Sequence, residues 1–177
     1  MTAQHSQSAT SIASVITRMA DELRTRFAQD HPGTGLEDAL MIGIHTGGVW
    51  VAERLHAQLG LQQSLGRLDI SFYRDDFSRI GMNPQVKPSQ LPTTVDDSHI
   101  ILVDDILHTG RTIRAALNEI FDYGRPASVT LVVLGERSGR ELPIQADIVG
   151  QHLSLSEHEH AKLTGPEPLQ LEVVEAP

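Results

Sequence analysis

Cysteine is absent from the 177 residues, and this absence excludes disulfides, thiolate metal sites and cysteine nucleophiles. Long apolar runs are also lacking: none approaches the roughly 20 residues of a membrane helix, and residues 1–10 contain no apolar signal core. Basic residues are few, because 14 Lys and Arg against 23 Asp and Glu give a net charge of −9. Such a charge disfavours indiscriminate binding to nucleic acid or to an anionic membrane. We therefore expect a soluble, cytoplasmic protein with no membrane partner.

The length of the chain corresponds to one domain with a single core. Residues 1–11 are small and polar and are expected to be a disordered terminus. We expect the folded domain to span residues 12–153. The remaining residues, 154–177, form an acidic tail whose apolar residues from Leu169 to Val174 could add an edge strand.

The spacing of apolar residues predicts alternating helices and strands. Apolar residues three and four apart predict helices at 12–27, 49–59 and 113–120. Short apolar or alternating runs predict strands at 39–44, 68–73, 99–103, 129–134 and 146–149. The alternation with short connections predicts an α/β fold with a central, mostly parallel sheet and helices on both faces.

Between Arg74 and Asp97 this periodicity disappears in an irregular stretch that contains three prolines. So long a stretch within a compact domain is typical of a disordered segment, a lid or a binding loop, and it could also hold a small hairpin.

The segment that indicates chemistry runs from Ile100 to Thr112. An apolar strand delivers two adjacent carboxylates, Asp104 and Asp105, to its carboxyl end, where open α/β sheets bind ligands. A turn of small residues then leads directly into a helix, whose N-terminal amides attract a phosphate. Paired Asp after a strand also serves as an ordinary turn or helix cap. The combination in this order favours a site for a sugar phosphate, because carboxylates accept hydrogen bonds from a ribose diol.

These residues resemble the type I phosphoribosyltransferases, and within them the PyrR family of pyrimidine-operon regulators with uracil phosphoribosyltransferase activity. The family pattern VDDVLYTGRTIRAAL is VDDILHTGRTIRAAL at Val103–Leu117, and LDITLYRDDLS is LDISFYRDDFS at Leu68–Ser78. Further matches include the RELPI run at Arg140–Ile144, so the resemblance covers about residues 12–150. It implies the type I phosphoribosyltransferase fold, with a flexible hood formed by residues 73–97.

The resemblance implies that Asp104 and Asp105 hold the ribose hydroxyls of 5-phosphoribosyl-1-diphosphate (PRPP). Its 5′-phosphate, or that of UMP, would lie against Ile106, Leu107, His108, Thr109, Gly110, Arg111 and Thr112. Mg²⁺ would be carried in by the diphosphate, with no direct protein ligand, since this ion favours substrate oxygens and water. The only other metal candidate, His158–His160, fits no zinc spacing, and a solvated tail is the preferred interpretation.

The remaining parts of the site also come from the resemblance. His45, Thr46 and Gly47 would bind diphosphate through backbone amides, at a turn where the family often has a non-proline cis peptide. The family's GIKTRG is GIHTGG at residues 43–48, so two cationic side chains are missing and we expect weaker PRPP binding. In the hood, Arg74 would face the diphosphate and assist catalysis. Base-side contacts would come from Arg137 and Arg140, for which simple surface charge is the alternative.

Two functions accompany this resemblance. The first is synthesis of UMP from uracil and PRPP; the second is regulation through a pyrimidine leader mRNA, with uridine nucleotides (UMP or UTP) as effectors. RNA-facing positions would be Thr17, Arg18 and Arg26, with Arg140; alternatively, the two helical arginines are only the solvent side of an amphipathic helix. The family also implies a homo-oligomer, dimer or tetramer. A non-catalytic nucleotide sensor acting through RNA or a protein is the main rival, and a purine phosphoribosyltransferase is less supported.

Overall fold

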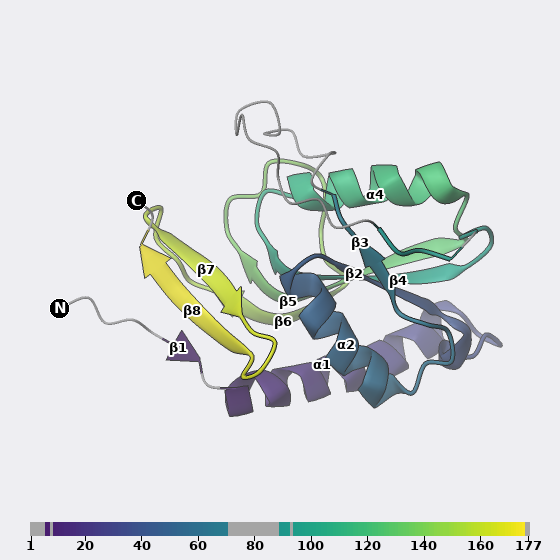
Figure 1. The fold of residues 1–177 in the computed structure, drawn as a ribbon, viewed down its shortest axis with the longest axis horizontal. Coiled ribbons are helices and arrows are strands. Elements are labelled where there is room, and N and C mark those ends of the chain that lie inside the picture. Colours follow the sequence, from purple (N-terminus) through teal and green to yellow (C-terminus); the bar gives the residue numbers. More distant parts are fainter. Residues whose placement is uncertain (1–5, 8, 71–88, 93, 176–177) are drawn as a thin grey trace.

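A computed structural model of the chain describes residues 6–7, 9–70, 89–92 and 94–175 (Figure 1). Its centre is a five-stranded sheet in the order β3-β2-β4-β5-β6. The strands are β2 (Leu40–Ile44), β3 (Gly66–Leu68), β4 (His99–Leu107), β5 (Ser128–Arg137) and β6 (Ile148–Leu153). Every neighbouring pair is parallel, so the prediction of a parallel α/β fold is confirmed.

Helices cover both faces of this sheet, as Figure 1 shows. The helices α1 (Ala9–Asp30) and α2 (Gly47–Leu59) lie on one face, and α4 (Arg111–Tyr123) lies on the other. A short 3₁₀ helix, η1, spans Leu36–Asp38. In β4 the side chains of Ile101 and Val103 belong to the α1–α2 core, whereas Ile100 and Leu102 belong to the α4 core. No helix in the described part of the chain is long and apolar enough to cross a membrane.

The central strands are longer than their apolar runs predict. β4 continues through the acidic pair to Leu107, and β5 continues to Arg137. The prediction that the strand ends at Val103 is therefore wrong. Pairing explains the difference: Asp104 lies opposite Val133 and Leu107 lies opposite Glu136 in the parallel register. The ladder hydrogen bonds hold polar residues in strand conformation where local composition alone favours a turn.

Both ends of the chain enter a second, three-stranded sheet in the order β1-β8-β7. It consists of β1 (Ser6–Gln7), β7 (Glu159–Thr164) and β8 (Gln170–Glu175). Ser6–Gln7 were expected to be disordered, and the tail was expected to add at most an edge strand. The tail instead forms an antiparallel hairpin whose residues Leu163 and Leu171 are buried in the α1–α2 core. Burial of these apolar side chains stabilises the hairpin.

The expected strand at 68–73 overlaps β3 only at Leu68, where β3 ends. Residues 69–70 are not in a strand, and residues 71–73 lie outside the described residues. Arg67 also forms an antiparallel bridge with Gln90 through two backbone hydrogen bonds. Most of the expected hood, including Arg74, lies outside the described residues.

Candidate active site

Three loops meet at one edge of the sheet, because parallel strands present their carboxyl ends on the same side. The first follows β2 and contains His45 and Thr46, the second joins β4 to α4 through residues 108–110, and the third follows β5 from residue 138. β4 lies between β2 and β5. The loop after β4 is therefore flanked by the other two, and the candidate site is centred on it.

The acidic pair is oriented by the backbone of β4. Asp104 is buried, with 5% of its surface exposed, and its Oδ1 accepts a hydrogen bond of 2.9 Å from the Asp105 N–H. Asp105 is half-buried, and its Oδ1 accepts a hydrogen bond of 2.7 Å from the Ile106 N–H. Because charge-assisted hydrogen bonds are strong, they hold each carboxylate in a fixed direction.

Two glycines at the start of α2 allow the first loop to approach the acidic pair. A Cβ on Gly47 would lie 2.2 Å from Asp105 Oδ2. A Cβ on Gly48 would lie 2.7 Å from the Val103 carbonyl oxygen and 3.0 Å from Asp104 Cα. Gly48 was not among the predicted site residues, although the Gly-Gly pair directly after a buried strand was a usable signal. The peptide bond between His45 and Thr46 is cis, as the resemblance implies, and the His45 N–H donates to the Leu68 carbonyl.

The turn into α4 has the geometry of an anion site. Gly110 has a φ of 92°, a left-handed conformation that favours glycine, and the 13-residue α4 begins directly after it. The first amides of a helix have no partner within the helix and carry a partial positive charge. Thr109 Oγ1, expected to face the phosphate, accepts a hydrogen bond of 3.2 Å from the Arg111 N–H. The Arg111 side chain is exposed and pairs with Glu141 at 2.8 Å.

The third loop packs directly on this turn. The amides of Glu141 and Leu142 both donate to the Thr109 carbonyl, at 3.0 and 3.1 Å. Gly139 lies against the His108 ring, since a Cβ there would be 2.8 Å from Nε2. Burial lowers the pKa of His108, and the nearby Arg137 and His160 side chains lower it further, while Glu141 acts in the opposite direction. These surroundings favour the neutral form of His108.

The two predicted base-side arginines differ in their surroundings. Arg137 points to the C-terminal hairpin: its Nη1 donates to the Glu159 carbonyl at 2.7 Å, and its Nη2 donates to the Ser156 carbonyl at 3.3 Å. These bonds join the end of β5 to β7. Arg140 is exposed in the third loop.

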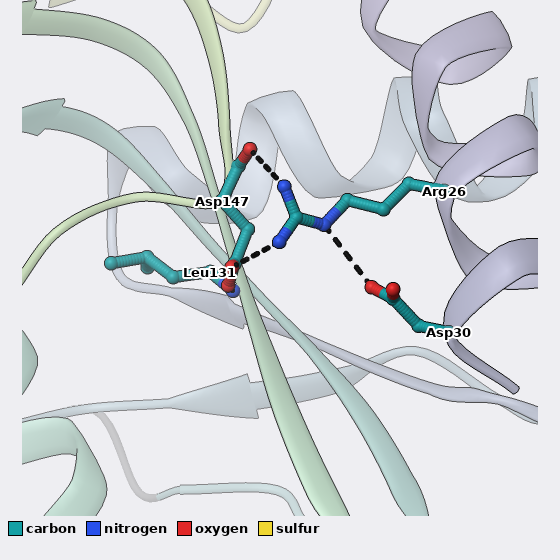
Figure 2. Close-up of polar contacts among 4 residues, drawn as sticks. All are labelled: Arg26, Asp30, Leu131 and Asp147. Atoms are coloured by element: carbon teal, nitrogen blue, oxygen red, sulfur yellow. Dashed lines mark hydrogen bonds and ion pairs between the residues drawn. The ribbon is translucent and has the colours of Figure 1, made fainter.

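Arg18 and Arg26 of α1 form hydrogen bonds to other parts of the chain. Figure 2 shows the Arg26 guanidinium between Asp147 and Asp30. It bonds the carboxylate and the carbonyl of Asp147 at 3.0 and 3.1 Å, while the other Asp147 oxygen accepts the Leu131 N–H at 2.8 Å. Arg18 donates to the Gly150 carbonyl. Thr17 bonds only one turn back, to the Ala13 carbonyl at 3.0 Å.

Comparison with known proteins agrees with this geometry. The family model "Phosphoribosyl transferase domain" matches residues 9–163. Bifunctional protein PyrR of Nitrosococcus oceani is 71% identical over 135 residues, which are 75% of this chain and 76% of that protein. Bifunctional protein PyrR of Pseudomonas aeruginosa is 58% identical over 160 residues, which are 90% and 92% of the two chains. The chain belongs to the PyrR family of phosphoribosyl transferase domain proteins.

Solved structures show the same fold at low sequence identity. Hypoxanthine phosphoribosyltransferase of Trypanosoma cruzi is 18% identical, with a TM-score of 0.67 over 96% of this chain and 95% of that chain. A purine phosphoribosyltransferase from Pyrococcus horikoshii is 19% identical, with a TM-score of 0.62 over 84% and 86%. The type I phosphoribosyltransferase fold expected for the PyrR family is therefore confirmed.

Proposed function

We propose that this PyrR family member transfers the phosphoribosyl group of PRPP to N1 of uracil, giving UMP and diphosphate, and that it regulates pyrimidine genes in the cytoplasm. The observation that carries the enzymatic part is the β4–α4 turn. There, two backbone-oriented carboxylates near the end of β4 are followed by a short turn and the N-terminus of a 13-residue helix.

Within this turn, Asp104 and Asp105 would accept hydrogen bonds from the two ribose hydroxyls. The amides of residues 109–112 would hold the 5′-phosphate at the positive end of α4. The carboxylate and phosphate oxygens are hard donors of the kind that Mg²⁺ prefers, and the ion would be held by substrate phosphates and water, with no direct protein ligand. Mg²⁺, carried by PRPP, would neutralise charge on the departing diphosphate.

The reaction needs little acid–base chemistry from the protein. The C1′–O bond to diphosphate breaks and its electron pair leaves with the diphosphate. The C1′–N1 bond to uracil forms, and the N1 proton passes to the departing diphosphate or to solvent water. Positive charge that develops on the ribose ring is stabilised by the fixed carboxylates, and the protein's main contributions are alignment and exclusion of water. The third loop, which packs on the phosphate turn, would carry the base-side residue Arg140, and Arg137 would act from the end of β5, directly before this loop.

The diphosphate would lie beside His45, Thr46 and Gly47. Because this loop lacks the Lys and Arg side chains of the family pattern, we propose that PRPP binding is weak. Arg74 of the hood would supply one compensating positive charge.

The regulatory part of the proposal concerns a pyrimidine leader mRNA and a homo-oligomer. Of the predicted RNA-facing residues, Thr17 and Arg18 are exposed, and Arg140 is exposed on the third loop. Arg26 is the least available, because Asp147 and Asp30 already bind its guanidinium. The competing function is a non-catalytic UMP or UTP sensor, which the uncharged diphosphate loop favours.

The experiment is an assay of UMP formation from uracil, PRPP and Mg²⁺. We expect product from the wild-type chain and a large loss in Asp105→Asn, with Glu157→Gln in the exposed tail as the matched control. UMP binding without any product would leave the sensor function. A gel shift with leader RNA at low and physiological salt tests the regulatory part, since RNA contacts weaken with salt.

A further inference from the structure

A buried carboxyl group on α4 faces the end of β3, on the opposite side of the helix from solvent. Only 6% of Glu119 is exposed. Its Oε1 lies 2.5 Å from Ser89 Oγ, whereas its Oε2 is buried and has no hydrogen-bond partner among the described residues. Buried carboxyl oxygens are usually satisfied, because an unpaired one costs stability. Glu119 is therefore poorly explained as a contribution to stability alone.

A chain of hydrogen bonds leads from Glu119 to the first loop of the site. Ser89 Oγ accepts the Asp69 N–H at 3.0 Å, so it joins Glu119 to the residue that directly follows β3. The preceding residue, Leu68, accepts the His45 N–H at 2.9 Å through its carbonyl. Glu119 is thus connected to the loop proposed to bind diphosphate, while its own helix begins at the turn proposed to bind the 5′-phosphate.

The electrostatic setting of Glu119 is acidic. Burial raises its pKa, and the nearby carboxylates of Asp69 and Asp122 raise it further, while the Ser89 hydrogen bond lowers it. An amide side chain at this position could make the same hydrogen bond without facing those charges. The hydrogen bond to Ser89, and not the negative charge, is therefore the interaction through which Glu119 acts.

We propose that Glu119 is a positioning residue: through Ser89 it fixes the end of β3, and with it the His45–Gly47 loop, relative to α4. The distance from the His45–Gly47 loop to the start of α4 sets the distance between the proposed diphosphate site and the proposed 5′-phosphate site of PRPP. This inference therefore rests on the proposed function. UMP has only the 5′-phosphate and does not span both loops. Glu119 therefore matters for PRPP and not for UMP.

The test compares Glu119→Leu, Glu119→Gln and Ser89→Ala with Asp122→Asn, a control that removes a neighbouring charge from the exposed face of α4. Loss of one buried hydrogen bond, worth about 1 kcal/mol, corresponds to about a fivefold change. We expect the KM for PRPP to rise about fivefold in Glu119→Leu and Ser89→Ala, with kcat and the Kd for UMP unchanged. Glu119→Gln restores the wild-type KM, and Asp122→Asn keeps it. The free energy of unfolding of Glu119→Leu is unchanged or higher.

Two results would overturn the inference. One is an unchanged KM for PRPP in Glu119→Leu, in a wild-type background that makes UMP; the proposed function then stands and only the positioning role fails. The other is an equal weakening of PRPP and UMP binding together with a lower stability, which shows a merely structural role. A wild-type chain that neither makes UMP nor binds PRPP in calorimetry rejects the proposed function and, with it, this inference.

Discussion

Substitution of Gly47 by alanine tests how tightly the first loop approaches the acidic pair. The added methyl carbon would lie 2.2 Å from Asp105 Oδ2, 2.8 Å from its Cγ and 3.0 Å from its Cβ. Because a normal contact needs about 3.5 Å, the carboxylate has to move by more than an ångström. The side chain can do so only by rotating, and the rotation breaks its 2.7 Å bond to the Ile106 N–H.

The expected loss follows from that hydrogen bond. A bond to a charged group contributes about 1.5–3 kcal/mol, which corresponds to about a ten- to hundredfold lower kcat/KM if Asp105 orients the ribose in the transition state. The obstacle at Gly47 is a side chain that can turn aside, so we expect the fold to remain, with a destabilisation of about 1 kcal/mol. The assay is UMP formation, with urea unfolding measured in parallel.

Gly48→Ala is the matched comparison, because its methyl group would meet the backbone of β4. Backbone cannot rotate aside, and overpacking costs about 1–3 kcal/mol, so Gly48→Ala loses more stability than Gly47→Ala. A double variant, Gly47→Ala with Asp105→Ala, separates the mechanisms. If the alanine acts through Asp105, the two effects on kcat/KM are not additive. Full activity in Gly47→Ala, or strict additivity, refutes the reasoning.

Three further predictions concern charge and stability. Burial lowers the pKa of His99, and the nearby His31 lowers it further. Below about pH 6.5 the unfolded chain therefore binds more protons than the folded chain, so the free energy of unfolding falls as the solution is acidified. In His99→Gln the urea concentration at the unfolding midpoint changes less between pH 7 and pH 5 than in the wild-type chain. An unchanged pH dependence contradicts the assigned role of His99. Glu141 raises the pKa of His108, so NMR titration of Glu141→Gln gives a lower His108 pKa; an unchanged or higher value contradicts this electrostatic effect. Asp147→Ala leaves the Leu131 N–H without its carboxylate partner, so the free energy of unfolding in urea falls by about 1–3 kcal/mol. A fall of less than about 0.5 kcal/mol, which is typical of an ordinary surface substitution, argues against that hydrogen bond.

The part of the site that could be predicted from sequence is the part encoded in contiguous residues. The strand, the acidic pair, the small-residue turn and the helix follow one another between Ile100 and Ile120, so local pattern and strand-end geometry place them together. The parallel sheet followed from the alternation of apolar runs for the same reason. The length of β4 could not be predicted, because pairing with β5 rather than local composition decides where it ends.

Contacts between distant residues were beyond local pattern. Arg26 is one of the predicted RNA-facing residues, and local pattern gives no sign that its guanidinium binds Asp147, 121 residues further along the chain. Arg137 is a predicted base-side residue, and local pattern gives no sign that it also binds the C-terminal hairpin. The hairpin in turn buries Leu163 and Leu171 in the α1–α2 core. The connection of Glu119 to Ser89 likewise joins two elements 30 residues apart. Such pairings are set by tertiary packing, which a single sequence does not show.

The most direct measurement of the central claim is a crystal structure of the chain with UMP. Our account predicts the 5′-phosphate on the amides of residues 109–112, at the start of α4, and the ribose hydroxyls on the carboxylates of Asp104 and Asp105. A nucleotide bound elsewhere, with the β4–α4 turn free of ligand, would contradict the account.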